Sequence, residues 1–198
     1  MARAQLTTST VIARAAEQAD ASGFDSVSLA AVARSLGVRT PSLYEHVRDL
    51  AALRDGVTVL ALDELATLTS DAVAGRAQRD ALLGLCSAHR TYAQSRPGCW
   101  ESLQRRAGPE AVSAPAAQRM VRVIDAVLRG YGIREGDRTH ATRIVGAAVG
   151  GFLNLERIGS FAHSEPGPDQ SWTELVDSLH FLLMHWQDRS PLEHKEPS

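Results

Sequence analysis

Apolar residues recur at helical spacing along most of the chain, and no stretch alternates apolar and polar residues as a strand would. This pattern predicts an all-α protein of about nine helices, with no internal repeat. Gly and Pro residues lie between the apolar stripes and mark the ends of the helices. The predicted helices cover residues 8–21, 29–36, 41–48, 50–73, 78–95, 99–106, 116–131, 139–160 and 172–187.

The segment from Ser28 to Asp49 carries the most specific pattern. Its apolar residues at i, i+3, i+4 and i+7 predict a short amphipathic helix. Ser28 precedes this stripe and is a favoured N-cap residue. Gly37 follows the stripe, where a helix commonly ends in a left-handed residue. The stripe consists of Leu29, Val32, Ala33 and Leu36.

A second short helix is predicted directly after this turn. Thr40 is placed to cap it, and Pro41 suits its first position, where a missing N–H costs nothing. Leu43, Tyr44 and Val47 are predicted to form its inward face. Two short helices joined by a turn with Gly form a helix-turn-helix, whose second helix enters the DNA major groove. An ordinary helical hairpin in a bundle core has the same spacing, so spacing alone leaves both readings open.

The order of residues around this unit narrows the choice. Across residues 8–55 the strings VIARAA, GF, SL, VA, LGV, PSLY and HV follow one another without a gap in spacing. In this order the segment resembles the N-terminal domain of the TetR family of bacterial transcriptional regulators. The string GVRTPSLYEHV is closest to the tetracycline-repressor-like branch of that family.

The resemblance implies a set of DNA-contacting residues. Arg39 would reach guanine acceptors or a phosphate, and Thr40 and Pro41 a thymine methyl or a base edge. Tyr44 and Ser28 would bind phosphates, although Tyr44 also fits partial burial with its hydroxyl at the rim. The family often has Lys at the start of the next helix, where this chain has a leucine, so Arg48 or Arg54 is expected to replace it. The predicted DNA-binding residues are Ser28, Arg39, Thr40, Pro41, Ser42, Tyr44, His46 and Arg48, with His46 either on a phosphate or capping a helix.

The rest of the chain resembles a second domain. Residues 88–106 (AHRTYAQSRPGCWESLQRR) and 147–161 (AAVGGFLNLERIGSF) are similar to the WHG-type C-terminal domain of one TetR branch, with Gly150 where His is usual. The resemblance implies a homodimer held by the last two helices, although an ordinary core within one chain also fits their pattern. It also implies a cavity for a small-molecule effector. The candidate ligand-binding residues are His89, Tyr92, Trp100, Leu103, Met120, Phe152, Asn154 and Glu156.

Composition adds two constraints. The chain has 198 residues, 44% hydrophobic and 22% charged, with a formal net charge of −2. No apolar run approaches the ~20 residues that span a membrane, and the first ten residues lack a signal-peptide pattern, so a cytoplasmic protein is expected. The segment through Leu50 is neutral, so DNA contact must come from placed groups and not from a broad positive field. Five arginines there (Arg3, Arg14, Arg34, Arg39, Arg48) match five acids (Glu17, Asp20, Asp25, Glu45, Asp49).

These patterns predict a DNA-binding domain over residues 1–55, a ligand-binding and dimerisation domain over 56–188, and a polar tail over 189–198. The chain has none of the common nucleotide, metalloprotease or hydrolase motifs, so neither an enzyme nor a cofactor is expected. Cys86, His89 and Cys99 give only a weak metal-site pattern. The predicted function is a ligand-responsive repressor that a small-molecule effector releases from a palindromic operator. The alternative is a helical ligand-binding protein without specific DNA recognition.

Overall fold

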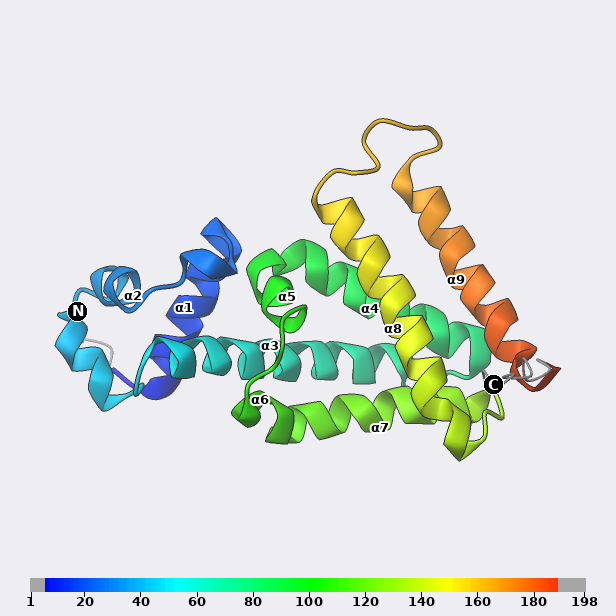
Figure 1. Ribbon diagram of the computed structural model, residues 1–198, viewed down its shortest axis with the longest axis horizontal. Helices are drawn as coiled ribbons and strands as arrows, with labels where there is room; N and C mark the ends of the chain where they lie inside the picture. Colours follow the sequence, from blue (N-terminus) through cyan, green and yellow to red (C-terminus); the bar gives the residue numbers. More distant parts are fainter. Residues whose placement is uncertain (1–5, 189–198) are drawn as a thin grey trace, which may run out of the picture. The chain divides into compact units, whose positions relative to one another are not determined.

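A computed structural model describes residues 6–188 of the protein (Figure 1). This part of the chain is helical and contains no strand, which confirms the all-α prediction. The α-helices are α1 (Thr8–Ser22), α2 (Leu29–Ser35), α3 (Leu50–Val73), α4 (Gln78–Ser95), α5 (Pro97–Leu103), α6 (Pro109–Ser113), α7 (Pro115–Gly130), α8 (Glu135–Arg157) and α9 (Pro168–Met184). Three short 3-10 helices are η1 (Phe24–Ser26), η2 (Thr40–Glu45) and η3 (Trp186–Asp188).

The chain divides into two compact units, each built from two segments. Unit 1 consists of residues up to Ala72 together with Ser87–Val123. Unit 2 consists of Val73–Cys86 and the residues from Ile124 onward. These units are defined by how compactly their residues pack and not by function. The boundary at residue 55 between a DNA-binding and a ligand-binding domain therefore stays a prediction. The predicted polar tail over residues 189–198 and Arg3 lie outside the described residues.

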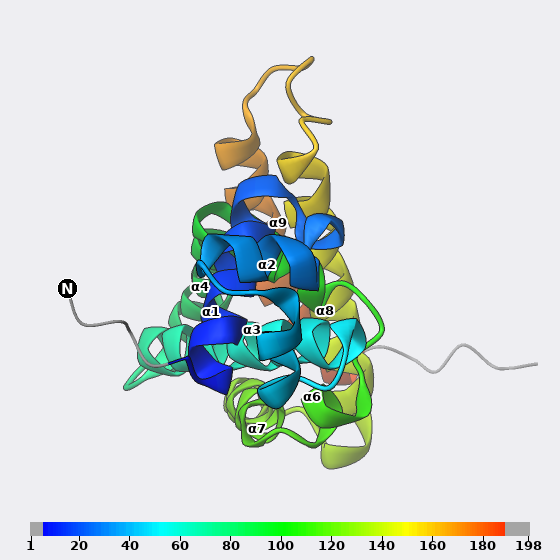
Figure 2. The same cartoon turned by 90° about the vertical axis from the view of Figure 1, so that its left-hand side faces the viewer.

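The head, which we define as α1, η1, α2 and η2, belongs to unit 1 and faces the viewer in Figure 2. Helix α1 begins with a capping box, in which the Thr7 hydroxyl accepts a hydrogen bond from the backbone N–H of Thr10 at 3.2 Å. The helix ends at Gly23, whose φ of 86° suits glycine. Phe24 then turns inward and is 5% exposed.

The turn after α2 follows the sequence prediction. The Ser28 hydroxyl accepts a hydrogen bond from the N–H of Ala31 at 3.3 Å, so Ser28 is the N-cap. Gly37 has a φ of 68°, and the next N–H, from Val38, donates to the carbonyl of Ala33 at 3.0 Å. These contacts close the end of α2 as a glycine C-cap does.

The second helix of this unit differs from the prediction in two respects. It is the 3-10 helix η2, and Arg39 occupies its N-cap position, so Thr40 does not cap it. Leu43 is buried as predicted, but Tyr44 is 56% exposed and does not point inward. In a 3-10 helix, residues three apart share a face, so the residue after Leu43 is turned away from the core.

Helices α3 and α4 have the predicted bounds, residues 50–73 and 78–95. Gly75 lies between them with a φ of 69°, which explains the break. The inward side of the first half of α3 is fully buried at Leu53, Val57 and Ala61. Helix α5 starts two residues earlier than predicted, at Pro97, and the predicted loop before residue 116 contains the short helix α6.

In unit 2, helices α8 and α9 lie side by side and run in opposite directions (Figure 1). Both begin four residues before the predicted starts, at Glu135 and Pro168, because each starts with residues that sit well in a first turn. Phe152 of α8 packs on Trp172 of α9, with ring centroids 5.2 Å apart. The Arg79 guanidinium pairs with Asp177 at 2.6 Å and joins α9 to the start of α4.

Candidate nucleic-acid interface

The exposed side of η2 presents the residues predicted to reach the major groove. Leu43 and Val47 face the core and hold η2 against α2. The side chains of Arg39, Pro41 and Tyr44 are exposed on the other side. This arrangement offers one guanidinium, one apolar ring and one phenol, a set that can read base edges and hold phosphates.

The other predicted contacts are half-buried: Ser28, Thr40, Ser42 and His46. The Ser28 hydroxyl already accepts the capping hydrogen bond, so it would donate to a phosphate while it keeps that bond. The backbone carbonyl of His46 accepts a hydrogen bond from the Thr8 hydroxyl at 3.2 Å, which joins the end of η2 to the start of α1. Contacts of these residues to DNA stay predictions.

Arg48 lies at the edge of this surface and pairs with Asp49 at 3.0 Å. The Arg48 side chain is 80% exposed, so this ion pair is weak and the guanidinium remains accessible to a phosphate. Asp49 also caps α3, since its Oδ1 accepts a hydrogen bond from the N–H of Ala52 at 2.7 Å. The capping hydrogen bond and Arg48 together lower the pKa of the Asp49 carboxyl.

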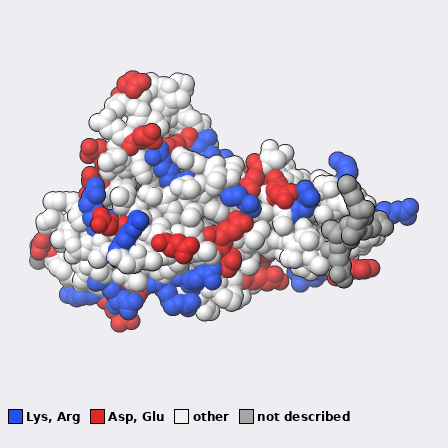
Figure 3. Space-filling model, turned by 180° about the vertical axis from the view of Figure 1, so that it is seen from behind, with Lys and Arg blue, Asp and Glu red and all other residues white. Residues whose placement is uncertain are grey.

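The charge of the interface is carried by single arginines. Positive and negative side chains are interspersed over the face shown in Figure 3, in agreement with the formal net charge of −2. Arg34, on the exposed side of α2, forms no ion pair with any described residue, and neither does Arg39. Sequence reasoning did not select Arg34, although its place in the last turn of α2 could have indicated it.

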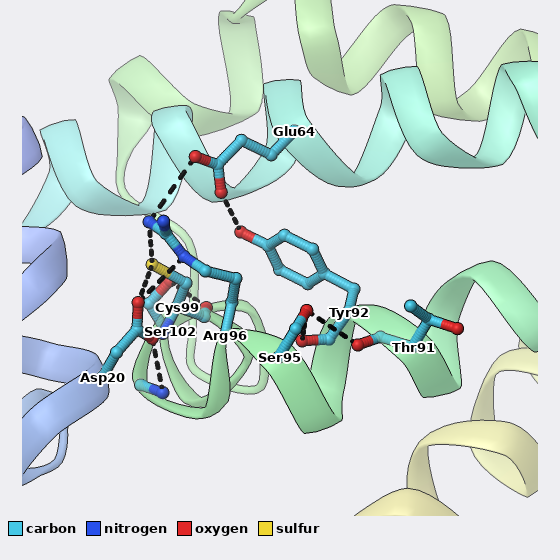
Figure 4. Close-up of polar contacts among 9 residues, drawn as sticks. Asp20, Glu64, Thr91, Tyr92, Ser95, Arg96, Cys99 and Ser102 are labelled. Atoms are coloured by element: carbon cyan, nitrogen blue, oxygen red, sulfur yellow. Dashed lines mark hydrogen bonds and ion pairs between the residues drawn. The ribbon is translucent and has the colours of Figure 1, made fainter.

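A cluster of polar contacts joins the head to α5 (Figure 4). Asp20 of α1 accepts hydrogen bonds from the backbone N–H groups of Gly98 and Cys99, both at 3.0 Å, and so caps α5. Its other oxygen pairs with the Nε of Arg96 at 2.8 Å. The Cys99 thiol lies beside Arg96 Nη2 at 3.2 Å, and its burial raises its pKa to about 11.

The same cluster extends to α3 and α4. A second nitrogen of Arg96 lies 3.5 Å from Glu64 of α3, and the hydroxyl of Tyr92 donates to the other Glu64 oxygen at 2.7 Å. Burial raises the pKa of Tyr92, with the Glu64 carboxylate adding to the effect. Sequence reasoning missed Asp20, Glu64 and Arg96, because no local spacing relates residues so far apart in the chain.

The eight candidate ligand-binding residues fall into both units. His89, Tyr92, Trp100, Leu103 and Met120 belong to unit 1, while Phe152, Asn154 and Glu156 belong to unit 2. Tyr92 and Trp100 are each 3% exposed, and the Trp100 ring meets His89 edge to face with centroids 6.2 Å apart. A role of these residues in ligand binding stays a prediction.

Two further features of the described residues bear on function. No group of three or more His, Cys, Asp or Glu side chains among residues 6–188 is arranged to hold a metal ion. Cys86 and Cys99 are free and buried. Within the same range, no helix is long and apolar enough to cross a membrane.

Comparisons with known proteins agree with this geometry. Residues 82–179 match a family model described as a tetracyclin repressor-like C-terminal domain. The chain is 30% identical over 181 residues to YobS of Bacillus subtilis, an uncharacterised HTH-type transcriptional regulator, and the match covers 91% of each chain. It is 32% identical over 158 residues to Rv0681 of Mycobacterium tuberculosis, another uncharacterised HTH-type transcriptional regulator, covering 79% of this chain and 72% of the relative.

A solved structure supports the same assignment. The fold is similar, with a TM-score of 0.69 and 25% identity, to that of a TetR variant from Acinetobacter baumannii AYE in complex with minocycline. That similarity covers 94% of this chain and 100% of the other. The family match covers the C-terminal region, and the match to YobS, over 91% of the chain, extends the similarity beyond that region. The chain therefore belongs to the TetR family of DNA-binding, HTH-type transcriptional regulators.

Proposed function

We propose that this regulator is a homodimeric repressor that binds a palindromic operator and leaves it when a small-molecule effector binds. The observation that carries the proposal is the outer side of η2, where Arg39, Pro41 and Tyr44 are exposed while Leu43 of the same helix is buried. A two-fold dimer places two such surfaces for half-sites about one helical turn or more apart.

The α8–α9 pair supports the homodimer. Exposed apolar side chains on these helices include Leu155 at 45%, Phe181 at 66% and Met184 at 48% exposure, and Ile158, directly after α8, is 64% exposed. A β-carbon at Gly146 or Gly151 of α8 would meet nothing within 4 Å, so a second helix could approach α8 closely there. We infer that the same helices of a second copy cover this surface.

The effector part of the proposal is supported by a relative's structure and by the long helix that follows the head. A structural relative is described in complex with minocycline, which makes a small-molecule effector a reasonable expectation for this chain. Helix α3 runs unbroken from Leu50 to Val73 and so connects the head to the helices that follow. A ligand that binds two arrangements of the head with different affinity would shift the protein between them. The eight candidate residues given above are the proposed ligand contacts.

The proposal is tested by selecting bound fragments from the source genome at ~150 mM salt, where non-specific binding is weak. The selected fragment is then titrated with the purified protein, and the oligomeric state is measured in parallel. A palindromic site bound in the nanomolar range by a dimer is the expected result. A monomer at micromolar concentration would contradict the homodimer, and only weak binding to all sequences would favour the ligand-binding alternative.

The expected effector is then sought by its effect on that operator. Genes next to the selected site suggest candidate compounds, and each is added to the preformed protein–operator complex. Release at ligand concentrations that saturate binding supports a repressor. Tighter operator binding with the ligand would contradict release and indicate a co-repressor or an activator instead.

A further inference from the structure

A pocket of about 720 Å³ lies within unit 1, between the head, the first two turns of α3 and the segment around α6. Its volume is in the range of sites for small molecules. None of the eight candidate ligand-binding residues lines it. We name it the arginine pocket, because four of its lining residues are Arg48, Arg54, Arg105 and Arg106.

The charges of these four arginines are unevenly compensated. Arg105 pairs with Asp25 at 2.7 Å and with Glu101 at 3.1 Å. Arg48 pairs with its neighbour in the sequence, as described above. The Nη2 of Arg54 instead donates to two backbone carbonyls, those of Asp25 and Val27, at 2.9 and 3.3 Å.

Backbone carbonyls satisfy the hydrogen bonds of Arg54 but carry no net charge, so its positive charge is not neutralised by them. Arg106 is exposed and forms no ion pair with any residue that the structure describes. The lining contains two acids, Asp55 and Glu110, against the four arginines. Three further carboxylates offset two of these arginines, Asp25 and Glu101 at Arg105 and Asp49 at Arg48, so the pocket carries no net positive charge. The guanidinium groups of Arg54 and Arg106 pair with none of these carboxylates, and they are the groups that favour an anion.

The remaining walls are largely apolar. The Phe24 ring contributes one wall, with the guanidinium carbons of Arg54 and Arg105 at 5.8 and 5.4 Å from its centroid. A site with apolar walls and a few charged groups selects a ligand that has both characters. The other apolar lining residues are Leu50, Ala51, Ala52 and Pro109.

We propose that the arginine pocket binds a small organic anion, with a carboxylate, sulfonate or phosphate group carried on an apolar or aromatic body. The anionic group lies among Arg54, Arg105 and Arg106, and the apolar body lies against Phe24 and the first turn of α3. This site is distinct from the effector contacts proposed above, and its binding chemistry does not depend on them.

The position of the pocket connects its occupancy to the head. Arg54 holds the carbonyl of Asp25 and Arg105 holds its carboxylate, so both arginines fix η1 to the rest of unit 1. An anion that binds these guanidinium groups competes with Asp25 for them. Occupancy is therefore expected to change operator affinity, a consequence that rests on the proposed function and is measured separately from binding.

The probe for the test is 8-anilinonaphthalene-1-sulfonate, whose fluorescence rises in apolar sites. Its matched control is N-phenyl-1-naphthylamine, which has the same rings without the sulfonate. Ala51→Phe fills the pocket and keeps its charges, while Arg106→Gln removes one charge from an exposed side chain. Arg122→Gln, on the exposed side of α7, is the control variant.

We expect one probe site per chain that Ala51→Phe abolishes. Arg106→Gln should raise the Kd of the sulfonate by about five- to tenfold, and Arg106→Lys should recover part of the affinity. Neither Arg106 variant should change the Kd of the neutral control, and Arg122→Gln should leave both probes unaffected. Circular dichroism of each variant confirms that it is folded.

Two results would overturn the proposal. Equal binding of both probes in the wild-type protein and in Arg106→Gln would show that the sulfonate is not recognised. Loss of operator affinity in Arg106→Gln, with a salt slope lower by about 1 and no site for the sulfonate, would assign the arginines to a DNA phosphate. If the operator selection fails while the sulfonate site is found, the proposed function is wrong and this inference stands.

Discussion

Gly98 of α5 lies so close to Ala19 of α1 that a β-carbon at position 98 would be 2.0 Å from the Ala19 carbonyl oxygen. The same β-carbon would be 2.5 Å from the backbone nitrogen of Asp20. Both neighbours are backbone atoms, which cannot rotate away as a side chain would. The capping of α5 by Asp20 depends on this approach, so a single glycine sets how closely the head meets α5.

Replacing Gly98 with Ala should therefore destabilise the protein, although Ala is the better helix former. Forcing a methyl group against backbone costs about 1–3 kcal/mol, more than the gain in helix propensity. Urea unfolding of the two proteins measures the difference. Gly136→Ala is the control, because a β-carbon there meets nothing within 4 Å. A Gly98→Ala variant as stable as the control would show that α1 and α5 can move apart without cost.

The hydrogen bond between Tyr92 and Glu64 gives a second prediction. Tyr92 is 3% exposed, and its hydroxyl donates to Glu64 at 2.7 Å. Tyr92→Phe keeps the ring but leaves a carboxylate oxygen without this donor, so we expect a loss of about 1–3 kcal/mol in the free energy of unfolding. The free energies of unfolding of the wild type, Tyr92→Phe, Glu64→Gln and the double variant form a double-mutant cycle. Additive losses would show that the two groups do not interact.

The pH dependence of stability can be predicted at Asp49. Hydrogen bonds from the N–H of Ala52 and from Arg48 lower the pKa of its carboxyl below the ordinary value of 3.8. A carboxyl with a lowered pKa in the folded state stabilises the protein above the unfolded pKa, and this contribution is lost as the pH falls through the folded pKa.

Asp49→Asn keeps a good capping side chain and removes the charge. The variant should be less stable than the wild type at neutral pH, and the difference should shrink as the pH falls below about 4. Urea unfolding across this range checks the sign. A difference that stays constant with pH would show that the charge of Asp49 contributes nothing, and that only its capping hydrogen bond matters.

The sequence predicted the helices wherever a local signal marked both ends. Gly75 lies between two long apolar stripes, and the bounds of α3 and α4 agree with the prediction. The 3-10 geometry of η2 could not be predicted in this way. Over six residues, a helix with 3.0 residues per turn and one with 3.6 place apolar residues at nearly the same positions. The pattern therefore predicted correctly that Leu43 is buried, but it did not predict that Tyr44 is exposed.

The contacts around the head depend on residues distant in sequence. Ser28 and Gly37 were recognised because capping and left-handed turns have local signatures. The pairing of Asp20 with Arg96 has no local signature, because each of these charged residues is also typical of a solvent-exposed helix face. The same holds for the arginine pocket, whose lining comes from three separate parts of the chain.

The exposure of Tyr44 makes it the sharpest test of the interface. A side chain that is 56% exposed and lies next to buried Leu43 can be truncated without opening the core. If the phenol contacts the operator, Tyr44→Ala should weaken DNA binding by about 1–3 kcal/mol and leave the dimer and its melting temperature unchanged. Tyr44→Phe separates the two parts of the side chain. A loss equal to that of Tyr44→Ala assigns the contact to a hydrogen bond from the hydroxyl, and an intermediate loss assigns part of it to the ring. Unchanged operator affinity in both variants would remove Tyr44 from the interface and leave Arg39 and Pro41 as the groups that read the groove.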